Sequence, residues 1–113
     1  MKPQVTMVGD GKAGLVTLEG EIDFSIVPEM REAIDEAIAS GPERLLIDLS
    51  AVLFIASDGL GVLIVALRNA DAAGRKMDLI KPQGHILDLL KTTQLTKLFH
   101  IHDNVDEAIR SLE

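Results

Sequence analysis

Short apolar runs alternate along the chain with longer segments of helical periodicity. Residues 4–8 alternate between polar and apolar side chains, and residues 15–19 do the same. This pattern predicts two strands. The Asp10-Gly11 pair between them favours a tight hairpin, so the two strands are expected to be antiparallel.

Four later segments have the spacing of amphipathic helices. The first covers about 28–40 and starts at Pro28, which suits the first turn because it has no N–H to leave unpaired. The second, about 57–73, is apolar on nearly all sides, so its neighbours should cover most of it. Shorter helices are predicted over 84–92 and 104–112.

Between these helices lie three more apolar runs, at 44–49, 77–81 and 99–102. The first is apolar almost throughout, as is typical of a strand covered on both faces. Strands joined through helices should be parallel, with right-handed crossovers. The sequence therefore predicts an α/β fold in the order ββαβαβαβα, with about five strands in a mixed sheet and about four helices. We expect one domain over 1–113.

Composition narrows the function. The chain of 113 residues is 47% hydrophobic and has a net charge of −7, which repels phosphate backbones and anionic lipids. We therefore expect no nucleic-acid partner. The absence of cysteine excludes disulfides, thiolate zinc sites and cysteine nucleophiles.

Targeting signals are also not apparent. The opening MKPQVTMVGD has no apolar core of a secretory signal. The apolar stretch at 60–67 is too short for a bilayer, which takes about 20 residues. We expect a cytoplasmic protein without membrane insertion.

The most informative segment is the start of the second long helix. Ser57 and Asp58 stand where a serine normally caps the helix and a carboxylate complements its dipole. This interpretation does not explain Gly59 and Gly61. Each glycine destabilises a helix by about 1 kcal/mol relative to alanine, a cost that is tolerated where another backbone or a ligand must come close. An exposed Ser57 hydroxyl here would be accessible to a kinase, and phosphorylation would add close to two negative charges.

Three motifs occur in order at characteristic spacing: Gly20-Glu21-Ile22-Asp23, LLIDLS at 45–50 and SDGLGVL at 57–63. Together they resemble the STAS domain family, of the stand-alone type that acts as a bacterial anti-sigma-factor antagonist. The resemblance covers essentially the whole chain. One position departs from the family pattern: the usual Asp before the phosphorylated serine is Ala56 here, and Asp58 follows that serine instead.

The resemblance implies a protein–protein switch in transcription regulation and stress response. The partner would be an anti-sigma factor with GHKL-type serine kinase activity, which phosphorylates Ser57, and a PP2C-type phosphatase would reset the switch. ATP would belong to the kinase, so we expect no cofactor and no catalytic activity in this chain. The residues implied for partner binding are Glu21, Asp23, Phe24, Ser57, Asp58, Gly59 and Gly61.

Two other classes of function remain open. A constitutive STAS subunit of a transporter or a stressosome-like assembly is slightly favoured by Ala56 and Asp58. A small-ligand or nucleotide sensor would use the helix N-terminus as its anion site.

Other candidate sites have simpler explanations. Phe24, Ile26 and Val27 precede the first helix and fit either a dry interface or the core. Glu21 and Asp23 would share a strand face, but a solvated strand end explains them without acid–base chemistry.

The histidines and the serine give little support for a metal site or an enzyme. His100 and His102, next to Asp103, are too few for a structural zinc site, and we expect them to face solvent. A hydrolase centred on Ser57 is disfavoured because IASDG is not the G-x-S-x-G elbow.

Overall fold

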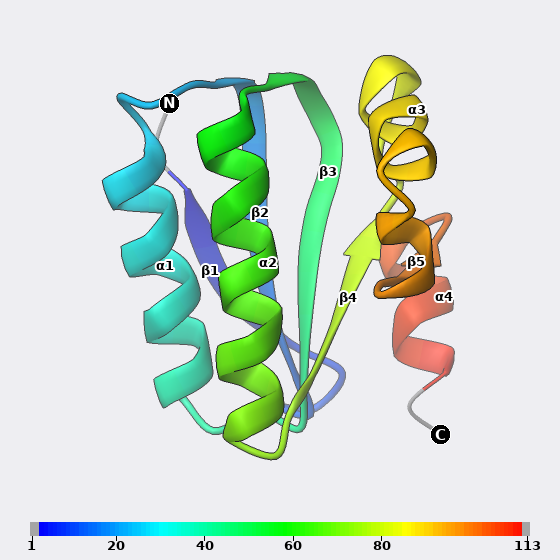
Figure 1. The fold of residues 1–113 in the computed structure, drawn as a ribbon. Helices are drawn as coiled ribbons and strands as arrows, with labels where there is room; N and C mark the ends of the chain where they lie inside the picture. Colours follow the sequence, from blue (N-terminus) through cyan, green and yellow to red (C-terminus); the bar gives the residue numbers. More distant parts are fainter. Residues whose placement is uncertain (1–2, 112–113) are drawn as a thin grey trace.

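A mixed five-stranded sheet in the order β1-β2-β3-β4-β5 forms the centre of the molecule (Figure 1). The computed structural model describes residues 3–111. Its elements are β1 (Gln4–Val8), β2 (Ala13–Ile22), α1 (Val27–Ala39), β3 (Arg44–Ile55), α2 (Ser57–Ala72), β4 (Lys76–Ile80), α3 (Gly84–Thr92), a 3₁₀ turn η1 (Leu95–Lys97), β5 (His100–His102) and α4 (Val105–Arg110).

The pairing of the strands confirms the predicted topology. β1 and β2 are antiparallel, with Val8 opposite Ala13, and the hairpin turn places Gly11 at a positive φ of 83°. The pairs β2–β3, β3–β4 and β4–β5 are all parallel. The predicted α/β class and element order are therefore confirmed.

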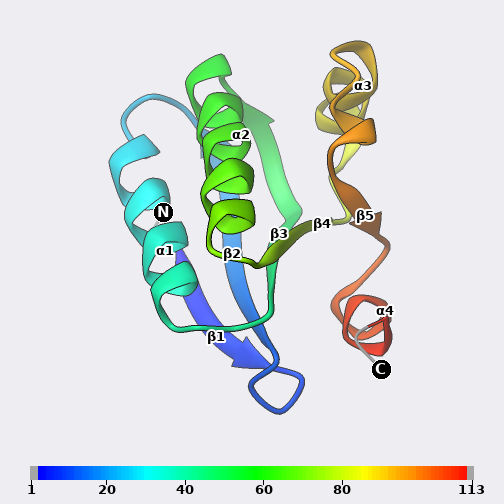
Figure 2. The same cartoon turned by 60° about the horizontal axis from the view of Figure 1, so that its bottom comes forward.

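Helices cover the two faces of the sheet unequally. α1 and α2 lie side by side across one face, as Figures 1 and 2 show, and the main apolar core fills the space beneath them. On β3, Leu45 and Ile47 point into this core. Leu46 points the other way and packs against Ala108 of the short helix α4. All three leucine and isoleucine side chains are buried, as predicted for a strand covered on both faces.

Two strands are longer than predicted. β2 continues to Ile22 and β3 to Ile55, because the far halves of these strands pair with each other. Two register shifts interrupt that pairing, between Thr17 and Glu19 and between Gly20 and Glu21. β-Bulges of this kind break the simple alternation on which the shorter predictions relied.

β3 also extends beyond β4. The last β4 partner is Ile80, which lies opposite Asp48, so the following part of β3 pairs only with β2 within the described residues. The loop before α3 contacts this free edge, where the Gln83 side-chain amide donates to the Ser50 carbonyl (3.0 Å). The end of β3 is therefore more open than its beginning.

The last helix is only partly as predicted. Asn104 caps α4 by accepting a hydrogen bond from the Glu107 N–H (2.8 Å), as the capping motif indicates. The helix ends at Arg110, and the predicted end at 112 lies outside the described residues. The turn η1 was not predicted from the pattern.

Candidate functional site

The segments that hold the candidate residues leave the sheet next to each other. Ile22 and Ile55 are paired at the ends of β2 and β3, and the Ala56 N–H donates to the Ile22 carbonyl (2.8 Å). α1 and α2 begin at this same edge, which is uppermost in Figure 1. The fold therefore brings the Asp23 loop and the Ser57 helix start together, although they are far apart in sequence.

Ser57 is exposed at the first residue of α2. The N-cap is Ala56, and no side chain in the described part of the chain caps this helix end. The alternative that Ser57 serves as the cap is therefore wrong, because the helix starts one residue earlier than that role requires. The first-turn N–H groups of α2 form a positive helix end that only Asp58 accompanies with a carboxylate in that turn.

The two glycines of this helix start differ in their surroundings. Gly59 is buried, and a Cβ there would lie 2.8 Å from Ile22 Cγ2 and 3.0 Å from Ile55 Cγ1. Gly59 therefore lets α2 approach the strand ends closely. A Cβ on Gly61 would meet nothing within 4 Å, so packing within the chain does not explain that glycine.

The loop after β2 is organised by Asp23. Its carboxylate accepts hydrogen bonds from the Ser25 hydroxyl and from the Ser25 N–H (2.9 Å). These two bonds stabilise the charged form and hold the pKa of Asp23 below its ordinary value of 3.8. The tight loop turns Ile26 into the core and leaves Phe24 76% exposed. Of the two alternatives that the sequence left open, Ile26 therefore belongs to the core and Phe24 is free for an interface.

Glu21 lies on β2 and is exposed opposite Phe54. Asp23 lies beyond the end of β2 and is engaged with Ser25. The two carboxylates therefore do not share a strand face as the i, i+2 spacing indicated.

Two apolar residues next to this site were missed from the sequence. Leu53 is 73% exposed and Phe54 is 45% exposed, although both lie within an apolar run. The Phe54 ring stacks on His85 at the start of α3, with 5.7 Å between the ring centroids. The sequence holds one sign of their exposure: the core residues Leu49, Val52 and Ile55 are three positions apart, whereas a regular strand buries every second residue.

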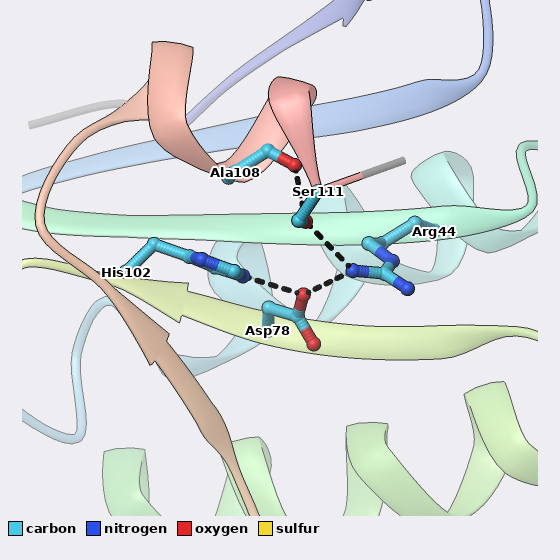
Figure 3. Close-up of polar contacts among 5 residues, drawn as sticks. All are labelled: Arg44, Asp78, His102, Ala108 and Ser111. Atoms are coloured by element: carbon cyan, nitrogen blue, oxygen red, sulfur yellow. Dashed lines mark hydrogen bonds and ion pairs between the residues drawn. The ribbon is translucent and has the colours of Figure 1, made fainter. Parts of the chain in front are cut away.

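A partly buried polar network joins β3, β4, β5 and the residue after α4 (Figure 3). The Asp78 carboxylate bonds His102 Nε2 (2.9 Å) and Arg44 (3.0 Å), and the same Arg44 nitrogen donates to the Ser111 hydroxyl (3.2 Å). His102 is buried, so the expectation that both histidines face solvent is wrong for it. The physical reason is the partner Asp78, which the sequence places 24 residues earlier.

His100 is exposed and stacks on the His102 ring. Within residues 3–111, no group of three or more His, Cys, Asp or Glu side chains is arranged to hold a metal ion. Each helix in that range is also too short or too polar to cross a membrane.

Comparison with known proteins adds a family and a fold. The sequence model of the family described as STAS domain matches residues 4–108. The chain is 30% identical over 101 residues to the anti-sigma-F factor antagonist RsfB of Mycobacterium tuberculosis (strain ATCC 25618 / H37Rv), covering 85% of this chain and 83% of the relative.

Two solved structures have the same fold. The anti-sigma factor antagonist from Mycobacterium paratuberculosis superposes with a TM-score of 0.85 at 27% identity, covering 97% of this chain and 92% of the other. The Bacillus cell fate determinant SpoIIAA in its phosphorylated form gives a TM-score of 0.77 at 22% identity, covering 98% and 99%.

Proposed function

Because this chain belongs to the STAS domain family, we propose that it is a cytoplasmic anti-sigma-factor antagonist that binds an anti-sigma factor and is switched off by phosphorylation of Ser57. The observation that carries the proposal is the exposed Ser57 hydroxyl at a helix start without a capping side chain, next to the Asp23 loop. The partner surface comprises Glu21, Asp23, Phe24, Ser57, Asp58 and Gly61. Gly59, which the resemblance also implied, is buried and supports this surface by letting α2 pack closely on the strand ends.

The relatives support this direction. RsfB is named an anti-sigma-F factor antagonist, and SpoIIAA, which shares the fold, is described in a phosphorylated form. For this chain, we propose a GHKL-type serine kinase as the anti-sigma factor and a PP2C-type phosphatase that removes the phosphate. The chain itself has no catalytic role in this cycle.

The switch follows from local electrostatics. A phosphate on Ser57 would bring close to two negative charges to a surface that already carries Asp58. The first-turn N–H groups of α2 would stabilise that phosphate within this chain. A partner docked over Ser57 would face the new charge and would have to desolvate it, so the complex would weaken.

The departure from the family pattern fits the same mechanism. Ala56 occupies the N-cap, where an aspartate side chain would accept hydrogen bonds from first-turn N–H groups. With alanine there, these groups stay available to a phosphate on Ser57. Gly61, with open space around its Cα, lets a partner backbone approach the same helix turn.

The test compares Ser57→Glu with Ser57→Ala. Binding to each purified GHKL-type kinase of the host is measured by biolayer interferometry. We expect Ser57→Ala to bind like wild type and Ser57→Glu to bind at least about tenfold more weakly, because only the second variant adds charge at the contact. Ser40→Glu, which adds the same charge at the C-terminal end of α1, should bind like wild type.

A constitutive subunit of a transporter or stressosome-like assembly is the second candidate. Asp58 favours it, because this exposed fixed charge next to Ser57 already resembles part of a phosphorylated state. In that case wild type and Ser57→Glu would hold the same partner with equal affinity. Equal affinities would also contradict the charge switch.

A further inference from the structure

We propose that the partner contact extends from Ser57 over the sheet edge onto Leu53 and Phe54, and that the partner presents there an apolar hollow with a cationic rim. This inference rests on the proposed function, because it assigns the surface to the same anti-sigma kinase. We call Phe24, Leu53 and Phe54 the apolar patch.

The apolar patch contains the two most exposed large apolar side chains among the described residues. Phe24 and Leu53 keep 76% and 73% of their surface accessible, and Phe54 keeps 45%. Single exposed apolar residues are common and need no explanation. Three large ones at one edge of a sheet, next to the residues proposed to contact a partner, mark an interaction surface.

The backbone displays Leu53 by a bulge. Gly20 pairs with Val52 and Glu21 pairs with Phe54, so Leu53 is an extra residue without a partner in β2. Val52 and Ile55 point into the core, whereas Leu53 and Phe54 between them do not belong to it. Bulges often occur next to functional sites, where they redirect a side chain. Here the bulge directs leucine towards solvent.

Within the described residues, the chain covers this part of the sheet only partly: the His85 ring stacks on Phe54, whereas Leu53 stays 73% exposed. On the face of the sheet opposite α1 and α2, α4 packs on Ala13, Leu46 and Ile80. These residues do not include Leu53 or Phe54, so α4 does not cover the patch. β4 ends opposite Asp48, five residues before Leu53. Phe24, Leu53 and the exposed part of Phe54 are therefore available to a partner without any rearrangement of the fold.

The charges around the patch define the partner's chemistry. Glu19 and Glu21 are exposed on β2 and alternate with the core residues Leu18 and Ile22, so they point to the same side as Leu53. Asp58 is exposed at the start of α2 on the other side of the strand end. An apolar centre within a carboxylate rim fits a partner surface with an apolar hollow bordered by lysine or arginine.

This extension has a measurable consequence. Leu53 lies outside the helix start that phosphorylation would charge, so its contribution to binding should be the same whether Ser57 is neutral or replaced by glutamate. The effects of changing Leu53 and Ser57 should therefore multiply in affinity.

The experiment measures affinity for the same purified kinases with Leu53→Ser and with Leu98→Ser as the matched control. Leu98 is 56% exposed and precedes β5, outside the proposed contact. We expect Leu53→Ser to weaken binding roughly fivefold to tenfold, both alone and combined with Ser57→Glu, and Leu98→Ser to leave it unchanged. Replacing Glu19 and Glu21 by glutamine should remove most of the dependence of the association rate on salt.

Each result has a defined meaning. If wild type binds and is sensitive to Ser57→Glu but Leu53→Ser binds equally well, the extended surface is wrong and the proposed function stands. If no kinase binds wild type, the proposed function fails and this inference fails with it. If Leu53→Ser instead only abolishes a dimer seen by light scattering, a second copy of the chain occupies the surface and the proposal is overturned.

Discussion

At the scale of single residues, Asp23 shows how a charged residue can position an apolar one. Its carboxylate accepts the hydroxyl and N–H of Ser25 and so fixes a loop whose tip is Phe24. Besides its own place in the proposed partner surface, Asp23 would therefore act on a partner through the orientation of Phe24. Protonation of the Asp23 carboxylate should therefore loosen this loop and leave the packing of the core unchanged.

The pH dependence of this loop has a clear sign. Because the folded-state pKa of Asp23 lies below 3.8, the stabilisation is fully present above that value and is lost as the pH falls through the lower folded pKa. Ser25→Ala should raise the pKa of Asp23 towards its ordinary value. An NMR titration of the Asp23 carboxyl carbon measures this shift, with Ser40→Ala as control. The same pKa in wild type and Ser25→Ala would contradict the hydrogen bond from the Ser25 hydroxyl, since alanine keeps the backbone N–H.

The two glycines of α2 should respond in opposite directions to alanine. Gly59→Ala forces a methyl group against the buried Ile22 and Ile55 side chains, and should destabilise the fold by about 1–2 kcal/mol after the gain in helix propensity. Gly61→Ala meets open space and should stabilise by about 0.5–1 kcal/mol. Urea denaturation of the two variants measures both values. A loss of stability in Gly61→Ala would show that its surroundings are not open.

At the scale of elements, the two halves of β3 differ in their surroundings: the first lies inside the sheet and the second is partly exposed. Its first half is buried on both faces and flanked by β2 and β4. Within the described residues, its second half pairs with β2 alone and carries Leu53 and Phe54 of the apolar patch. The two bulges permit this change, because each shifts the side-chain alternation by one residue.

The attachment of β5 and α4 depends on the Asp78 network at the first half of β3. Asp78→Val should cost about 2–4 kcal/mol, because it leaves the buried His102 without its partner. Adding His102→Phe should restore part of this loss, because it removes the buried unpartnered imidazole, whereas Arg44 still lacks its Asp78 partner. Denaturation midpoints of the two single variants and the double variant complete a double-mutant cycle. Strictly additive losses would show that the two side chains do not interact.

At the scale of the whole molecule, the two ends of the sheet separate recognition from structural support. The edge where β2 and β3 end carries Ser57 and the apolar patch. The region around Arg44 and Asp78 holds the C-terminal elements through polar contacts, of which the Asp78–His102 bond is buried. A partner could therefore bind the first edge without disturbing the second.

Hydrogen exchange should reveal this division. Amides in 45–47, with paired strands on both sides, should exchange roughly 100-fold more slowly than those of 51–54 and of the edge strand β1. Exchange measured by NMR on the isolated protein tests the order. Equally slow exchange at 51–54 would mean that the end of β3 is covered in solution.

Much of the architecture was predictable because it depends on local pattern. Alternating runs and amphipathic spacing predicted five strands, four helices and their order, and the hairpin and crossover rules predicted the antiparallel and parallel pairs. The motifs around Asp23 and Ser57 indicated the family that the comparison identified. These features need only neighbours in the chain or general rules of connection.

What the sequence alone determined was thus the order of the elements, the family and the candidate residues near Ser57. Only the tertiary structure decided that Ala56 rather than Ser57 is the N-cap, that Phe24 faces solvent, that a bulge exposes Leu53, and that His102 is buried against Asp78. The physical reason is that the helix start, the bulge and the burial of His102 each depend on a partner far away in sequence, and that the exposure of Phe24 depends on how its loop meets the finished sheet edge. Pairing register, close packing and buried hydrogen bonds are settled only when the strands and helices come together.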